Sequence, residues 1–250
     1  MNILILCIFN ETYRNNKLQN IQRILLETQR QKITNKFSID YYFITYDESI
    51  TEEFKLIGDT LFIKGNESLL NIVDKTIKSL RYFTNDKEYD FIVRTNISTA
   101  YNYNLLYNHL NELPKNNLYN GGLLFKLGWI DEPCGITKYN IEKYSLDGLY
   151  YFQGTCIILS PDVVKFILDN HNNLIHEVVD DVSICLFIKN YLPNVYLNFL
   201  NNFKIPIYSK ICKEQKLYDI NSIFYRHKSC NDDEDIKDMI NTTRIINIVT

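Results

Sequence analysis

Three clusters of polar side chains in this chain have the residue types and spacing of a binding or catalytic site. The first is Arg94–Ser98, a largely polar row that directly follows the apolar run Phe91–Val93. An apolar run of this kind is typical of a buried strand, and polar groups at its carboxyl end are typical of a binding crevice. The second cluster is Tyr151–Asp162 and the third is Val178–Val182. We therefore expect all three to contribute to one site.

The third cluster contains two adjacent carboxylates, Asp180 and Asp181, at the start of an expected helix. In most proteins such residues only cap the helix. The alternative is catalytic, because adjacent carboxylates repel one another and the pKa of one of them rises toward the working range of a general base. The residues alone leave both interpretations open.

The segments that must position these clusters alternate between strand and helix patterns in the first half of the chain. This alternation predicts an α/β fold with a mostly parallel sheet covered by helices. Strands are expected at Ile3–Phe9, Ile39–Thr45, Leu61–Ile63 and Phe91–Arg94, helices at Asn15–Gln31 and Ser68–Phe83, and a short helical turn at Glu52–Leu56.

The second half of the chain is more irregular, and it contains no repeat, low-complexity linker or domain boundary. We therefore expect a single domain over residues 1–250. Strands are expected at Thr155–Ser160 and Ile220–Arg226, with a strand pair in Leu118–Leu127 around its two glycines, and helices at Asn102–Leu113, Pro161–Asn170, Asp181–Asn190 and Asp232–Thr243.

Composition excludes several classes of function. The formal net charge of −3 over 250 residues gives no long-range attraction to nucleic acid, so no nucleic-acid partner is expected. The six cysteines show no zinc-like spacing, and we interpret them as reduced thiols of a cytoplasmic protein, either bacterial or in the host of a virus. The apolar start Asn2–Phe9 is too short for a membrane span, so no transmembrane anchor is expected.

The order of the blocks resembles the β-1,3-galactosyltransferase and Fringe family of inverting glycosyltransferases, which have the GT-A fold. The resemblance covers roughly residues 55–245. Its blocks are Gly58–Phe62, Ser68–Leu70, Lys75–Tyr82, Phe91–Ser98, Tyr150–Asp162, Asp180–Ile184 and Phe224–Lys228. Each block alone is weakly specific, and their shared order carries the resemblance.

This resemblance implies a glycosyltransferase that moves a sugar from a nucleotide-sugar, a uridine diphosphate sugar, to a glycan or protein acceptor. The nucleotide-binding half would be about 1–100 and the acceptor-binding half about 101–250. Asp181 would be the general base, with Asp180 supporting it or binding the acceptor hydroxyl. Gln153, Gly154 and Thr155 would form the acceptor or sugar pocket. Trp129 is a further candidate for this pocket because sugars stack on aromatic faces, although a lone tryptophan is more often part of the core.

The donor would bind at the carboxyl edge of the sheet, where ligands of α/β folds bind. The first two strand ends would contribute Phe9, Asn10 and Asp47. The remaining donor-binding residues would be Lys75, Arg94, Thr95, Asn96, Ser98, Arg226, His227 and Lys228.

The chain departs from the family at the metal motif, where Asn96 and Ser98 replace two aspartates. Neutral oxygens bind a hard cation such as Mn²⁺ or Mg²⁺ weakly. Three outcomes are open: a weakly bound metal with Asn96, Ser98 and His227 as candidate ligands, diphosphate neutralisation by Arg, Lys and His side chains alone, or an inactive enzyme. We expect weak metal or none, with activity retained.

Two other classes of function remain. The chain could be a catalytically silent sugar- or nucleotide-binding scaffold that keeps the fold. It could also be a kinase or nucleotidyltransferase, but it contains no Walker loop and no dinucleotide glycine fingerprint.

Overall fold

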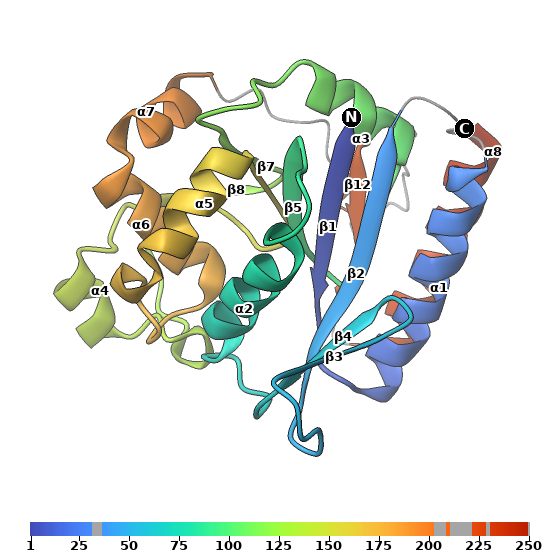
Figure 1. The fold of residues 1–250 in the computed structure, drawn as a ribbon, viewed down its shortest axis with the longest axis horizontal. Coiled ribbons are helices and arrows are strands. Elements are labelled where there is room, and N and C mark those ends of the chain that lie inside the picture. The colour runs from blue at the N-terminus through green and yellow to red at the C-terminus, as the bar shows by residue number, and fades with distance from the viewer. Residues whose placement is uncertain (32–36, 203–208, 211–221, 229–230, 250) are drawn as a thin grey trace.

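The computed structural model describes residues 1–31, 37–202, 209–210, 222–228 and 231–249. A seven-stranded sheet, ordered β3-β4-β2-β1-β5-β10-β7, runs through the molecule with helices on both faces (Figure 1). The strands of this sheet are β1 (Asn2–Ile8), β2 (Ser38–Asp47), β3 (Phe54–Ile57), β4 (Thr60–Lys64), β5 (Phe91–Asn96), β7 (Tyr119–Gly121) and β10 (Cys156–Leu159).

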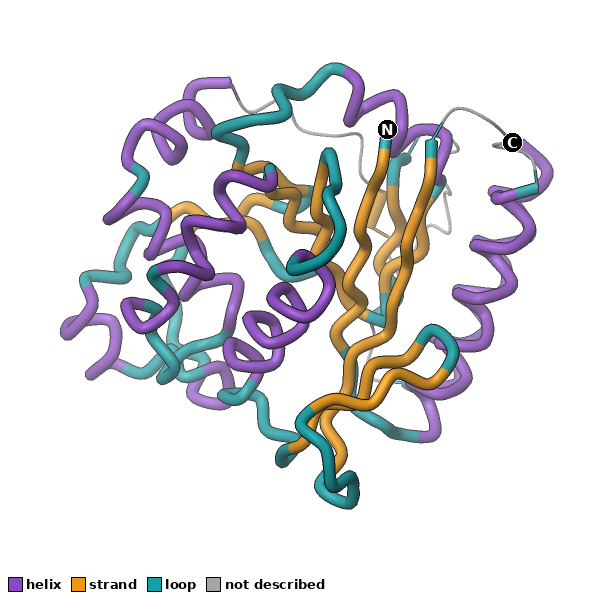
Figure 2. The backbone as a smooth tube through the Cα atoms, viewed as in Figure 1, coloured by secondary structure: helices purple, strands orange, loops and turns teal. Residues whose placement is uncertain are grey.

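The sheet is mostly parallel, as the sequence predicted. β1 pairs in parallel with both β2 and β5, and β2 pairs in parallel with β4. The antiparallel pairs lie toward the edges, where β3 pairs with β4 and β10 pairs with β5 and β7. Figure 2 shows the long strands running between the helices. Strands from both halves of the chain therefore share one sheet.

Side-chain alternation along β1 divides the hydrophobic core into two layers. Leu4 and Leu6 belong to the layer beneath α2 (Ile72–Thr84), α5 (Pro161–Asp169) and α6 (Asp180–Tyr191). Ile3 and Ile5 belong to the opposite layer, which includes side chains of α1 (Tyr13–Arg30), α3 (Tyr103–Asn111) and α8 (Asp232–Val249). A strand buried on both faces must be apolar throughout, which explains the unbroken run at the start of the chain.

Smaller elements complete the structure. A three-stranded sheet, ordered β11-β12-β6, joins β6 (Thr99–Tyr101), β11 (Ser209–Lys210) and β12 (Phe224–Arg226), and a two-stranded sheet joins β8 (Leu124–Lys126) and β9 (Tyr150–Phe152). The remaining helices are η1 (Glu132–Cys134), α4 (Lys138–Tyr144), η2 (His171–Asn173) and α7 (Pro193–Asn202).

Two predicted elements are wrong. The segment predicted as a helical turn at Glu52–Leu56 overlaps strand β3, which forms a hairpin with β4. Gly58, in a left-handed conformation with φ of 60°, makes the two-residue connection. The strands expected to pair around Gly121 and Gly122 instead pair elsewhere, β7 with β10 and β8 with β9. An added Cβ at Gly122 would lie 2.1 Å from the Phe224 ring, so the glycine lets the chain pass this side chain.

Other boundaries differ by a few residues. The helix expected from Ser68 begins at Ile72, and the last helix extends beyond Thr243 to Val249. The last predicted strand is present at Phe224–Arg226, while Ile220 and Asn221 lie outside the described residues.

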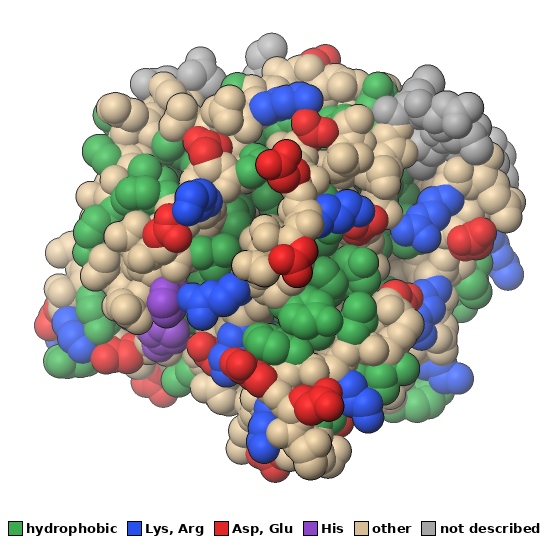
Figure 3. All heavy atoms as spheres, viewed as in Figure 1, with side chains coloured by type: hydrophobic (Ala, Val, Ile, Leu, Met, Phe, Trp, Pro, Cys, Tyr) green, Lys and Arg blue, Asp and Glu red, His purple; other side chains and the backbone are tan. Residues whose placement is uncertain are grey.

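Three expectations from the sequence concern a membrane span, the cysteines and the surface charge. None of the helices in the described ranges is both long enough and apolar enough to cross a membrane. Cys7, Cys134, Cys156 and Cys185 are free thiols, whereas Cys212 and Cys230 lie outside the described residues. Acidic and basic side chains are interspersed on the face seen in Figure 3.

Candidate functional site

A cavity of about 390 Å³ lies at the carboxyl edge of the sheet, where β1 and β5 end side by side. The parallel register places Ile8 opposite Asn96, so polar residues that follow the two strands meet there. Of the predicted donor-binding residues, the cavity is lined by Phe9, Asn10, Lys75, Asn96, Ser98 and Lys228. Its lining also includes Glu67, Arg14 and Asn15, which the sequence analysis did not select.

Asn96 offers an unused hydrogen-bond acceptor at this cavity. It is the last residue of β5, and its buried Oδ1 has no hydrogen-bond partner among the described residues. Buried amide oxygens are nearly always hydrogen-bonded, so an exception in a cavity lining suits a ligand that brings a donor. Ser98 is buried next to it, and its carbonyl accepts a hydrogen bond from the His227 backbone N–H at 2.7 Å.

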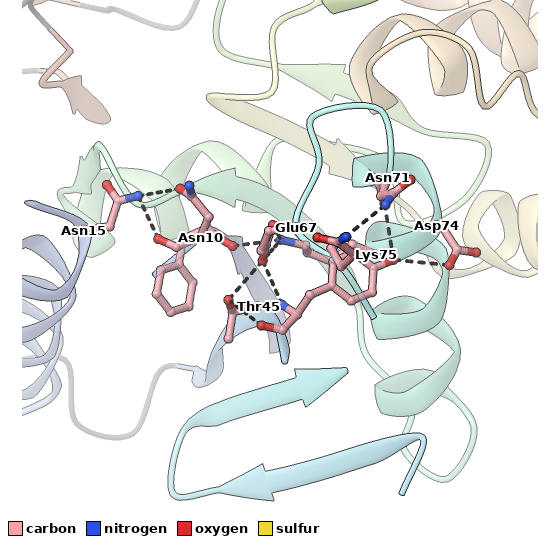
Figure 4. Close-up of polar contacts among 10 residues, drawn as sticks. Asn10, Asn15, Thr45, Glu67, Asn71, Asp74 and Lys75 are labelled. Carbon is pink, nitrogen blue, oxygen red and sulfur yellow. Dashed lines mark hydrogen bonds and ion pairs between the residues drawn. The ribbon is translucent and has the colours of Figure 1, made fainter. Parts of the chain in front are cut away.

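The Lys75 ammonium is buried and holds a neighbouring carboxylate (Figure 4). Its Nζ donates to the Phe9 carbonyl at 2.9 Å and to the Glu67 carboxylate, with Oε2 at 2.7 Å. Burial lowers the pKa of Lys75, Glu67 opposes this effect, and the positive charge of Arg94 adds to the lowering. We conclude that Lys75, predicted as a diphosphate ligand, has its donors engaged within the protein.

Arg94 forms a buried, two-point ion pair with Asp180. Its Nε and Nη2 each lie 2.8 Å from one oxygen of that carboxylate, and Thr76 Oγ1 donates to the same group at 2.6 Å. The remaining Nη1 donates to the Gly154 carbonyl. Alternation along β5 places Arg94 on the same face as Asn96. The ion pair therefore lies on the same face of the sheet as the Asn96 side chain, and neither Arg94 nor Asp180 is part of the cavity lining.

Asp181 is held differently, although it is the next residue. Its Oδ2 accepts from the Gly154 backbone N–H and its Oδ1 from the Val182 backbone N–H, both at 2.8 Å. Burial is the largest cause that raises the pKa of Asp181 to about 6, and the charge of Asp180 is the second. Arg94 and the two backbone N–H groups lower this pKa but do not outweigh the rise. Asp181 is 9% exposed and is not part of the 390 Å³ cavity lining.

The Gly154 backbone connects Asp181 to the ion pair of Arg94 and Asp180. Its carbonyl accepts from Arg94 and its N–H donates to Asp181. A Cβ at this position would lie 2.3 Å from Arg94 Nη1, so only glycine allows the guanidinium to approach the backbone this closely. The polar clusters Tyr151–Asp162 and Val178–Val182 therefore meet through Arg94, which belongs to the cluster Arg94–Ser98.

The C-terminal basic block has three different environments. Arg226 donates to Gln153 Oε1 and lies opposite Thr99 in the β12–β6 pair. His227 is buried, which lowers its pKa to about 4, and neither ring nitrogen has a partner in the described part of the chain. Lys228 is exposed and lines the cavity. At neutral pH, therefore, His227 is uncharged and Lys228 brings positive charge to the cavity.

The other predicted site residues are not part of the cavity lining. Asp47 accepts from the Ser49 backbone and hydroxyl at 2.8 and 2.7 Å and so stabilises the turn after β2. Thr95 and Thr155 are buried together, with Thr95 Oγ1 donating to the Thr155 carbonyl at 2.7 Å. Trp129 is 41% exposed and contacts the Phe125 ring edge-on, with ring centroids 5.9 Å apart.

The residues near Asn96 fit a resident divalent cation poorly. The described chain contains no group of three or more His, Cys, Asp or Glu side chains placed to hold a metal. Asn96 and Ser98 supply neutral oxygens, and the Glu67 carboxylate is already paired with Lys75. Hard cations prefer several charged oxygen ligands, so we assign no step to a metal.

Sequence reasoning missed Glu67 because it lies in the connection between β4 and α2, outside any polar cluster. A signal was nevertheless present: an acidic residue follows a predicted strand, and it precedes Lys75 by eight positions on the way into a helix. Polar residues in such connections lie at the carboxyl edge of the sheet.

Comparisons with known proteins were made at the level of sequence and of structure. No family model and no curated protein matches this chain. A glycosyltransferase involved in the glycosylation of the major capsid of PBCV-1 is similar over 96% of this chain and 98% of its own, with 11% identity and a TM-score of 0.45. The galactosyltransferase LgtC, in complex with donor and acceptor sugar analogues, is similar over 98% of this chain and 95% of its own, with 11% identity and a TM-score of 0.47. At these values the likeness identifies neither the family nor the reaction of this chain.

Proposed function

We propose that this protein is a glycosyltransferase that uses a nucleotide-sugar, a uridine diphosphate sugar, as donor and a hydroxyl group of a glycan or protein as acceptor. The observation that carries the proposal is the cavity at the β1 and β5 edge. There Asn96 supplies a free acceptor, Lys228 a positive charge and Glu67 a carboxylate. Asn96 would accept a hydrogen bond from the nucleotide-sugar, Lys228 would bind its anionic diphosphate, and Glu67 would bind its hydroxyl groups.

Asp181 is proposed as the general base of an inverting reaction. The acceptor hydroxyl would transfer its proton to the Asp181 carboxylate while its oxygen forms a bond to the anomeric carbon. The bond from that carbon to the diphosphate oxygen breaks in the same step, and the electron pair leaves with the diphosphate. The raised pKa of Asp181 supports this role, because a carboxylate with a pKa of about 6 is a stronger base than an ordinary aspartate.

Asp180 is proposed as a support for Asp181 rather than as a second base. Its carboxylate is neutralised by the buried Arg94 side chain and accepts a further hydrogen bond from Thr76. The charge of Asp180, next to Asp181 in the chain, contributes to the raised pKa of Asp181.

Lys228 is proposed to neutralise the departing diphosphate, with Arg226 nearby on the same segment. The acceptor pocket is proposed to lie near Trp129 and Gln153, on the second half of the chain, while residues 1–100 supply most of the cavity. An exposed aromatic ring such as Trp129 can stack on a sugar. We further propose that the protein acts in the cytoplasm, bacterial or of a virus-infected host.

A catalytically silent binding protein is the second candidate. The neutral side chains of Asn96 and Ser98 and the low exposure of Asp181 favour it. Such a protein would bind the nucleotide without turning over its sugar conjugate.

The test is a screen of nucleotide-sugars for hydrolysis by the wild-type protein and by Asp181→Asn, with titration of uridine diphosphate into both. We expect wild-type turnover, a loss of about 100-fold or more in the variant, and similar nucleotide binding in both. The matched control is Asp162→Asn, because Asp162 also lies in the first turn of a helix and accepts a backbone N–H, from Asn117. Binding without turnover in the wild type would favour the silent protein, and full activity of Asp181→Asn would exclude Asp181 as the base.

A further inference from the structure

Glu67 is the one carboxylate among the described residues that line the cavity at the β1 and β5 edge. Its side chain is 31% exposed, so the carboxylate is accessible from the cavity. It lies in the connection between β4 and α2, and Lys75, its ion-pair partner, lies one turn into that helix.

Three donors from two different elements fix this carboxylate (Figure 4). Glu67 Oε1 accepts from the Tyr46 backbone N–H at 2.8 Å and from Thr45 Oγ1 at 3.1 Å, both at the end of β2. The Lys75 ammonium of α2 contacts both carboxylate oxygens. Lys75 is itself tied to the end of β1 through the Phe9 carbonyl. A long acidic side chain rarely keeps one orientation unless it is held in this way, so the geometry is preorganised.

The hydrogen-bond inventory limits what this carboxylate can bind. Among the described residues, Oε2 receives a hydrogen bond from Lys75 alone and so retains acceptor capacity. An ionised carboxylate repels phosphate and accepts hydrogen bonds from hydroxyl groups. Lys228, which also lines the cavity, attracts phosphate instead. A ligand with an anionic group and a pair of hydroxyl groups would therefore bind in one orientation.

We propose that the Glu67 carboxylate accepts hydrogen bonds from the two adjacent hydroxyl groups of the donor's ribose and thereby selects ribonucleotides. Lys75 is a positioning residue that orients Glu67. This inference rests on the proposed function, because it assumes that the cavity binds a nucleoside diphosphate. It extends that function by assigning the nucleoside end of the donor to the ends of β1 and β2 and its diphosphate end to Lys228.

The test is titration of uridine diphosphate, its 2′-deoxy and 3′-deoxy analogues and a uridine diphosphate sugar into the wild-type protein, Glu67→Gln and Asp74→Asn. We expect the wild type to bind uridine diphosphate about tenfold or more tightly than either deoxy analogue, because a hydrogen bond to a charged group is lost. In Glu67→Gln this preference should fall to less than about threefold. Asp74→Asn is the matched control, since Asp74 accepts from the nearby Tyr46 hydroxyl but does not line the cavity.

Each result has a distinct meaning. Equal wild-type affinity for uridine diphosphate and its deoxy analogues would overturn the inference while leaving nucleotide binding intact. A preference that persists in Glu67→Gln would overturn it too. So would a change of affinity in Glu67→Gln for the uridine diphosphate sugar alone, because Glu67 would then bind the transferred sugar. Absence of wild-type binding to all four compounds would instead contradict the proposed function. If Glu67→Gln fails to fold, equal wild-type affinity for uridine diphosphate and its deoxy analogues would still overturn the inference.

Discussion

Asp180 and Asp181 are neighbours in the chain, yet their carboxylates have different hydrogen-bond partners. The Arg94 guanidinium donates two hydrogen bonds to the Asp180 carboxylate, one to each oxygen. Among the described residues, the hydrogen-bond donors to Asp181 are backbone N–H groups, and burial together with the charge of Asp180 raises the pKa of Asp181. A buried carboxyl group whose pKa is raised in this way is typical of acid–base sites.

The raised pKa of Asp181 predicts how activity depends on pH. If Asp181 is the base, nucleotide-sugar turnover should rise as pH increases from about 5 to 7, with a midpoint near 6, because the carboxylate must be ionised to accept a proton. The measurement is kcat/KM across this range. A rate that is flat between pH 5 and 7 would contradict the assignment.

The same pKa predicts a stability change that does not depend on activity. The folded-state pKa of Asp181 lies above its ordinary value of 3.8, so the folded protein binds more protons than the unfolded chain between these limits. The contribution of Asp181 to the free energy of unfolding should therefore fall as pH rises from about 4 to 6. Asp181→Asn should remove this dependence relative to the wild type, as measured by denaturant unfolding at each pH, whereas Asp162→Asn should keep it.

At the residue scale, sequence reasoning selected the acidic pair and Asn96 because each follows an apolar run. It selected Lys228 because Phe224–Lys228 resembles the closing basic block of the family. It did not predict that Arg94 would pair with Asp180, which lies 86 positions away. Nor did it predict that Lys75 would be engaged by Glu67. Both pairings depend on contacts between separate elements, which residue type and spacing do not determine.

The loop around Gly135 connects the expected acceptor region to the acidic pair. The Val179 backbone N–H donates to the Cys134 carbonyl at 3.1 Å, which ties this loop to the residue before α6. Gly135 itself has φ of 72°, and an added Cβ would lie 1.9 Å from the Glu177 carbonyl oxygen. The start of α6 therefore depends on close packing of two backbones at a glycine.

Gly135→Ala should lower the free energy of unfolding by about 2 kcal/mol or more, since it adds left-handed strain to a backbone clash. The measurement is chemical denaturation. Gly128→Ala, in the same loop region, is the matched control, because its Cβ would meet nothing within 4 Å. We expect a change of no more than about 0.5 kcal/mol for that variant. Equal stability of the two variants would contradict the packing described here.

At the element scale, the sequence predicted the long strands and helices well, since apolar periodicity reports burial directly. The short strands β6, β9 and β3 were not predicted, because each has only three or four residues and gains its pairing from a distant partner. The antiparallel direction of β10 was likewise not predicted, since it depends on the path of the chain between β5 and β10.

Across the whole molecule, the two halves of the chain contribute to one sheet and to one polar edge. β1 and β5 come from the first half, β10 and α6 from the second, and Lys228 reaches the cavity from near the C-terminus. The convergence of distant polar clusters was predicted from the carboxyl-edge rule. The separation of Asp181 from the cavity lining was not, because it depends on how deeply α6 packs.

Titration of uridine diphosphate into the wild-type protein and into Lys228→Ala shows whether this cavity binds a nucleoside diphosphate. We predict saturable one-to-one binding by the wild type and about tenfold weaker binding by Lys228→Ala, because the variant loses a charge-assisted contact to the diphosphate. Lys165→Ala, which removes an exposed lysine of α5, should bind like the wild type. No wild-type binding at millimolar nucleotide, or unchanged affinity in Lys228→Ala, would contradict the account.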